Sequence, residues 1–227
     1  MNIVFFSLKC RPYEPLSAEG LKHFTMKTLF LVALAMAHRI GELQALSSSV
    51  GFNKDGSAIL SFAHDFVAKT QLKDRSVLRD FVIPSLKSIT DDKDELLLCP
   101  VRALKLYLKV TRFESRANRL FVSPRDFSKP LSKNAISFFL RSVIIDAYSS
   151  IPEKWVKISK VNAHEIRAVA TSLRFKYNIN EIDIKSAYWR LNSIFCSRYL
   201  RDPTHSYLDV SGLGPLIVAQ GIVQHVD

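Results

Sequence analysis

Apolar residues recur at helical spacing along most of this chain. From about Leu21 to Leu46 they predict a helix that ends at the polar sequence SSSVG, with Ser17 as a plausible cap. A second helix is predicted over CPVRALKLYLKVTRF, with Pro100 in the first turn, where the N–H that proline lacks would have no helical partner. Ser132 is expected to open a third helix over SKNAISFFLRSVIIDAYSS.

The last third of the chain predicts further helices. In VNAHEIRAVATSL, residues 161–173, an apolar stripe has the spacing of a buried helix face and consists of Ile166, Val169, Ala170 and Leu173. NEIDIKSAYW and NSIFCSRYL follow, the second of them stopped before Pro203. The final stretch SGLGPLIVAQGIVQHVD is apolar but interrupted by three glycines and a proline. We therefore expect residues 203–227 to form a C-terminal tail that needs a surface to lie on.

Residues 50–84 contain the one convincing β pattern. SAILSF and VLRDFVIP predict short strands, NKDG predicts a turn, and the polar sequence AKTQLKDRS predicts an exposed hairpin connection. Neither an internal repeat nor a linker divides the chain. The predicted architecture is therefore a single domain over residues 1–227, mainly α with one small antiparallel sheet (α+β).

Composition narrows the class of protein. A chain of 227 residues that is 48% apolar and 11% aromatic can bury a good-sized core. The longest apolar run, TLFLVALAMA at residues 28–37, is too short to cross a bilayer and predicts a buried core helix. With no leader pattern at the start, we expect an intracellular protein that is neither secreted nor a membrane protein.

The cysteine positions and the net charge indicate which metal sites and which binding partners to expect. Cys10, Cys99 and Cys196 are widely separated, which argues against a disulfide framework and a zinc site, so a structural metal is not expected. No cofactor is expected either. Lys and Arg exceed Asp and Glu by 32 to 21, a net charge of +11. This excess favours a polyanionic partner, nucleic acid before a membrane surface, although a generally basic soluble protein is the plainer alternative.

Arg39 and Glu42 are the first candidate site residues. In AMAHRIGELQAL, residues 35–46, they stand three positions apart and are expected to share a helix face. An arginine after so apolar a segment must reach solvent or pair with an anion, because burying it unpaired is costly. The simpler interpretation is an arginine that reaches solvent beside its partner Glu42.

The other candidates stand at three later places. Lys69 lies at the start of the hairpin connection, and His164 and Arg167 lie three apart on one predicted helix. Trp189 and Tyr199 occur in AYWRLNSIFCSRYLRD, residues 187–202. Taken singly, each has an ordinary interpretation: a solvated lysine, a core-edge histidine beside a solvated arginine, and aromatic core residues.

In this order, however, the candidates resemble the catalytic domain of the tyrosine recombinases, DNA integrases and site-specific recombinases related to type IB topoisomerases. RIGEL resembles the family's first arginine box, AKT its hairpin lysine, HEIR its H-x-x-R box, and Trp189 followed by RYL its nucleophile box. The resemblance runs from about Pro12 to Asp202 and is greatest to recombinases of DIRS-like retrotransposons and related eukaryotic mobile elements. The N-terminal DNA-clamping domain of that family is expected to be absent.

The resemblance implies metal-independent cleavage and rejoining of double-stranded DNA through a covalent 3′-phosphotyrosyl intermediate. Arg39 and Arg167 would grip the scissile phosphate, because guanidinium forks match its non-bridging oxygens, with help from the indole N–H of Trp189. Tyr199 would be the nucleophile, as it alone among nearby tyrosines has the right distance from Trp189. His164 would act as base, Lys69 would protonate the leaving oxygen, and Glu42 would support the cationic cluster.

The resemblance further implies a nuclear location and, through the apolar tail, a homo-oligomer such as a synaptic tetramer on DNA. A relict that keeps the fold and binds DNA without cutting it is the main alternative. A basic helical interaction domain without a site is the third.

Overall fold

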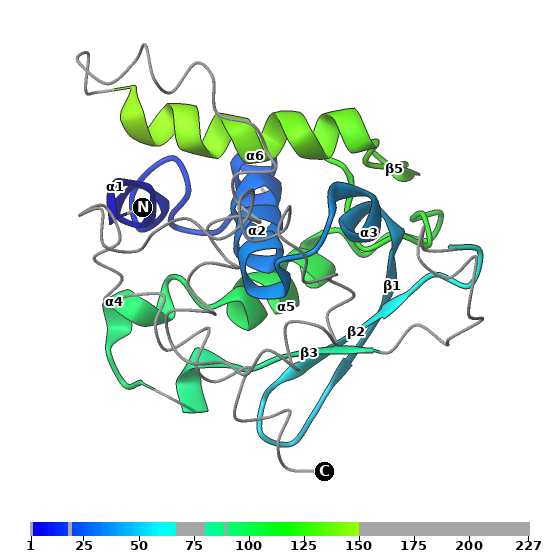
Figure 1. Ribbon diagram of the computed structural model, residues 1–227, viewed down its shortest axis with the longest axis horizontal. Coiled ribbons are helices and arrows are strands. Elements are labelled where there is room, and N and C mark those ends of the chain that lie inside the picture. The colour runs from blue at the N-terminus through cyan, green and yellow to red at the C-terminus, as the bar shows by residue number, and fades with distance from the viewer. Residues whose placement is uncertain (1, 18–19, 67–79, 89, 150–227) are drawn as a thin grey trace, which may run out of the picture.

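The computed structural model describes residues 2–17, 20–66, 80–88 and 90–149 (Figure 1). Its elements, in chain order, are α1 (Asn2–Leu8), α2 (Leu21–Met36), α3 (Ile40–Ala45), β1 (Leu46–Phe52), β2 (Ala58–Phe62), β3 (Phe81–Ile83), the short 3₁₀ helix η1 (Leu86–Ser88), α4 (Lys93–Leu96), α5 (Pro100–Val110), β4 (Val122–Ser123), β5 (Asp126–Pro130) and α6 (Lys133–Tyr148). Helices with small antiparallel sheets confirm the expected α+β class.

α2 is the central helix of this fold. It contacts both α5 and α6 and lies between them in Figure 1. Every residue from Phe24 to Met36 is buried, which confirms the core helix predicted from TLFLVALAMA. A helix that is apolar on all sides can be stable in water only when other elements cover all of its faces. No described helix is long and apolar enough to cross a membrane.

The single helix predicted from Leu21 to Leu46 is wrong. α2 ends at Met36, because Ala37 adopts a left-handed conformation with φ of 54°, and a separate short helix, α3, begins at Ile40. The predicted cap is also wrong, since Gly20 and not Ser17 precedes α2. The break lets the chain turn out of the core before the candidate residue Arg39.

β1 occupies the serine-rich sequence that was expected only to end a helix. It pairs with β2, and β2 pairs with β3, in an antiparallel sheet of order β1-β2-β3. Serine has little intrinsic preference for strands, so the pairing with β2 decides the conformation here. The predicted strands of SAILSF and VLRDFVIP are confirmed at β2 and, in its described part, at β3.

The turn predicted at NKDG is confirmed between β1 and β2. Asn53 accepts a hydrogen bond from the N–H of Gly56, which has a φ of 86° that glycine adopts without strain. The hairpin connection after β2 lies largely outside the described residues. The expectation of a single sheet is wrong, because β4 and β5 form a second antiparallel pair.

α5 and α6 confirm two predicted helices. Pro100 is the first residue of α5, and the Ser132 hydroxyl accepts a hydrogen bond from the Ala135 N–H at the start of α6, with a donor–acceptor distance of 3.1 Å. α1 was not predicted. The helices predicted beyond residue 149 lie outside the described residues.

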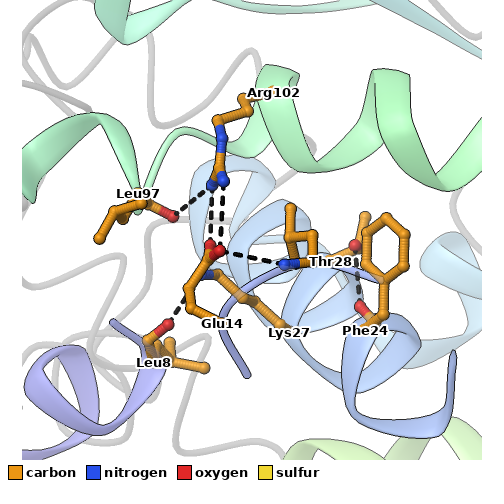
Figure 2. A network of polar contacts seen from close by, with 8 residues as sticks. Leu8, Glu14, Phe24, Lys27, Thr28, Leu97 and Arg102 are labelled. Atoms are coloured by element: carbon orange, nitrogen blue, oxygen red, sulfur yellow. Dashed lines mark hydrogen bonds and ion pairs between the residues drawn. The ribbon is translucent and has the colours of Figure 1, made fainter. Parts of the chain in front are cut away.

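A buried ionic network joins α1, α2 and α5 (Figure 2). Glu14 accepts hydrogen bonds from Lys27 on α2 and, through both carboxylate oxygens, from the Arg102 guanidinium on α5, at 2.8 and 3.2 Å. Lys27 also donates to the carbonyl of Leu8, the last residue of α1, at 2.7 Å. The Lys27 side chain is fully buried, so these acceptors replace the water that its ammonium group loses on folding.

The network changes the pKa of both buried partners. Burial lowers the pKa of Lys27 to about 8, although the hydrogen bond and charge of Glu14 oppose this shift. Burial alone would raise the pKa of Glu14, but hydrogen bonds from Arg102 and Lys27 outweigh it and lower the pKa. The positive charge of Lys27 is therefore tolerated in the core only because Glu14 compensates it.

We predict that Glu14→Gln destabilises the fold by roughly 3–5 kcal/mol, because it leaves the buried Lys27 ammonium without a carboxylate. Lys27→Met should cost clearly less, since the charge is removed and Glu14 keeps the bidentate contact with Arg102. Urea unfolding of both variants followed by circular dichroism measures the difference. Equal losses in the two variants would contradict this account of the network.

Lys27 also predicts a pH dependence of stability. The folded protein releases this proton near pH 8, whereas an unfolded lysine holds it to about 10.4, so the unfolded chain binds more protons in between. The free energy of unfolding should therefore rise by roughly 1–2 kcal/mol from pH 8 to 10. Lys27→Met should lack this rise when unfolding is measured at the two pH values. Equal changes in the wild type and in Lys27→Met would contradict the prediction, because this comparison cancels the opposite contribution of Tyr13, whose pKa is raised by burial.

Candidate functional site

Two of the predicted site residues, Arg39 and Glu42, lie in the described part of the structure. Lys69, His164, Arg167, Trp189 and Tyr199 lie outside the described residues. The described part of the predicted site is therefore the segment that follows α2.

Arg39 lies at the start of α3, where it is the residue before the first helical position. The expectation that Arg39 and Glu42 share one face of a continuous helix is thus wrong, because α2 has already ended. Glu42 is instead the third residue of α3, and its Oε2 accepts a hydrogen bond from the Arg39 backbone N–H at 2.9 Å. This contact caps the helix and fixes the backbone of Arg39.

The Arg39 side chain is free to face solvent while its backbone is held. The guanidinium NH1 lies 3.7 Å from Glu42 Oε1, and the Arg39 side chain is 44% exposed against 11% for Glu42. Both expected fates of this arginine are therefore observed, a contact with a carboxylate and access to solvent. A guanidinium has five N–H donors, so contact with one carboxylate oxygen leaves donors for another anion.

His38 is a part of this site that the sequence reasoning missed. It is 6% exposed, and its Nδ1 lies 2.8 Å from Glu42 Oε2, the same oxygen that accepts the Arg39 N–H. Because a carboxylate only accepts, Nδ1 is the donor. The signal was present in the sequence as a histidine four residues before the glutamate, but the helix spacing did not indicate a buried pair.

The ends of β2 and β3 contact the same histidine. The His38 ring packs edge-on against Phe62, the last residue of β2, at 6.0 Å between centroids, and against Phe81, the first of β3, at 5.3 Å. The N–H of Ala63 donates to the carbonyl of Ala45 at 2.8 Å, which ties the end of β2 to the end of α3. The connection that carries Lys69 in the sequence therefore starts and ends beside the Arg39 segment.

A separate cavity of about 500 Å³ lies between η1, α4 and α5. Its wall is mainly apolar and includes Leu97, Cys99 and Leu106, with Lys87 and Lys105 among its cations. Neither Arg39 nor Glu42, the two predicted site residues within the described ranges, lines it. Among the described residues, no group of His, Cys, Asp and Glu side chains is arranged to hold a metal ion.

Comparison with known proteins assigns no family. No protein-family model matches the chain, and neither a curated protein nor a solved structure matches it. The case for a function therefore rests on the residues and on their geometry.

We predict that Glu42→Ala destabilises the fold by about 1–3 kcal/mol, because it removes the acceptor for the buried His38 Nδ1–H and the cap of α3. Arg39→Ala should cost under about 1 kcal/mol, since the side chain is half exposed and its ion pair is long. Thermal unfolding of the two variants tests this ranking. A larger loss for Arg39→Ala would assign the stabilising role to the guanidinium.

Proposed function

We propose that this chain is the catalytic domain of a tyrosine recombinase, which cuts and rejoins double-stranded DNA through a covalent 3′-phosphotyrosyl intermediate. The observation that carries the proposal is the state of Arg39. Its backbone is fixed by Glu42 while its guanidinium remains half exposed. A fixed backbone together with an accessible guanidinium is the arrangement needed to bind a phosphate in one geometry.

Chemistry without a metal explains why such an arginine is needed. The scissile phosphate gains negative charge as a fifth oxygen approaches, and guanidinium groups can neutralise it in place of a metal ion. Arg39 would bind one non-bridging oxygen, and Arg167 would bind the other. Trp189 would add its indole N–H as a further donor. Glu42 holds the Arg39 backbone through its N–H.

The covalent step then has a role for each remaining candidate. The Tyr199 oxygen forms a bond to phosphorus, and the bond from phosphorus to the 5′ oxygen breaks. His164 takes the phenol proton, since a phenol of pKa about 10 is a poor nucleophile at neutral pH. Lys69 gives a proton to the leaving 5′ oxygen. The end of β2 and the start of β3 both contact His38, and Lys69 lies in the sequence that connects these two strands. This arrangement supports the role proposed for Lys69.

The charge of the chain supports DNA as the partner. The excess of 32 Lys and Arg over 21 Asp and Glu favours binding along a phosphate backbone. We include in the proposal a nuclear location, an origin in a mobile element, and a synaptic homo-tetramer in which residues 203–227 contact a neighbouring copy.

The proposal predicts a covalent protein–DNA adduct. The full chain is incubated with random-sequence duplexes whose nicks let the cleaved fragment diffuse away, and adducts are detected on a denaturing gel. Tyr199→Phe should abolish the adduct. Arg39→Ala should slow its formation by about 100- to 1,000-fold, as the loss of one transition-state donor does. Arg39→Lys should fall between, because it keeps the charge and loses the fork.

Arg112→Ala is the matched control, since it removes an exposed arginine from another part of the fold. An adduct that persists in Tyr199→Phe would refute the assigned nucleophile. Salt-sensitive binding of DNA with no adduct under any condition would favour the alternative, a relict that binds without cutting.

A further inference from the structure

We propose that His38 is a positioning residue for Arg39 and sets the direction of its guanidinium through the carboxylate of Glu42. The role of the guanidinium in catalysis rests on the proposed function. The geometry that links the three side chains does not, and it can be tested in the free protein.

The link runs through the two oxygens of Glu42. Oε2 accepts from His38 Nδ1 at 2.8 Å and from the Arg39 backbone N–H at 2.9 Å, while Oε1 faces the Arg39 guanidinium at 3.7 Å. Two donors on one oxygen fix the plane of the carboxylate, and that plane decides where the other oxygen lies. Without the His38 donor, Oε2 would lose one of these two hydrogen bonds.

His38 itself is held more firmly than the arginine. Its ring is nearly perpendicular to those of Phe62 and Phe81, at 89° and 80°, and both strand ends belong to the three-stranded sheet. Edge-on packing of this kind restricts the rotation of a ring. The sheet thereby fixes His38, His38 orients Glu42, and Glu42 orients an arginine that is otherwise half in solvent.

Two substitutions separate the hydrogen bond from the packing. His38→Phe keeps a ring between Phe62 and Phe81 but removes the donor to Glu42. His38→Asn places an amide N–H near the position of Nδ1 and so restores the donor. His23→Phe is the control, because His23 also packs edge-on against an aromatic ring, that of Tyr13, at 5.7 Å between centroids, but lies on α2.

The first measurement needs no activity. The Nε–Hε signal of Arg39, assigned by its loss in Arg39→Lys, is followed by ¹⁵N NMR relaxation in the free protein. We expect His38→Phe to shift this signal and increase its fast motion, and His38→Asn to restore it in large part. An Arg39 signal that is unchanged in His38→Phe, in a protein that remains folded, overturns the inference.

The second measurement uses adduct formation. His38→Phe should slow it by about tenfold, within the range that a misplaced positioning contact produces, and should slow it no further in an Arg39→Ala background. On a duplex with a methylphosphonate at the cleavage site, which lacks the phosphate charge, the defect should shrink for both variants. Additive defects, or a defect that is unchanged on methylphosphonate, would assign His38 a purely structural role.

The two measurements also separate the two proposals. If the wild type forms no adduct, the proposed chemistry fails, and the NMR measurement still decides whether His38 positions Arg39. If the wild type forms an adduct and the Arg39 signal does not respond to His38→Phe, the recombinase proposal stands and the inference on His38 fails.

Discussion

The burial of one charge in the central helix constrains this fold. α2 is buried from Phe24 to Met36, and Lys27 lies within that stretch. Its ammonium group cannot reach water, so the chain must bring an acceptor to it. Glu14 does so from the segment after α1, and Arg102 holds Glu14 from α5. Correct assembly of three elements is thereby coupled to neutralisation of a single lysine, which favours one arrangement of the helices over others of similar apolar burial.

The helices could be predicted where their apolar pattern and their caps agreed, as at Pro100 and Ser132. The errors arose where distant pairing decided the structure. The serines of β1 have the composition of a loop and become a strand because β2 lies beside them. Ala37 gave no sign of a break, because alanine favours helices and rarely adopts the left-handed conformation that it has here.

The candidate site could be predicted only in part, because its residues are adjacent in the sequence but its geometry depends on the fold. Arg39 and Glu42 could be identified because a charged pair directly after an apolar run is conspicuous. Their geometry could not, because it depends on the end of α2. The spacing of His38 and Glu42 was visible in the sequence, but the burial of His38 was not, since Phe62 and Phe81 are brought to it by strand pairing that no local pattern reveals. A buried polar residue is identified by its neighbours in space.

The place of Arg39 at the head of α3 has an evolutionary consequence. Serine, aspartate or asparagine is preferred there, and a cation faces the positive end of the helix dipole, so arginine is among the less stabilising choices. Replacing it with serine or aspartate would add on the order of 1 kcal/mol of stability. Under selection for folding alone, position 39 would therefore tend to lose its arginine. An intact Arg39 in a diverged copy of this chain would be evidence that selection still acts on what the guanidinium binds.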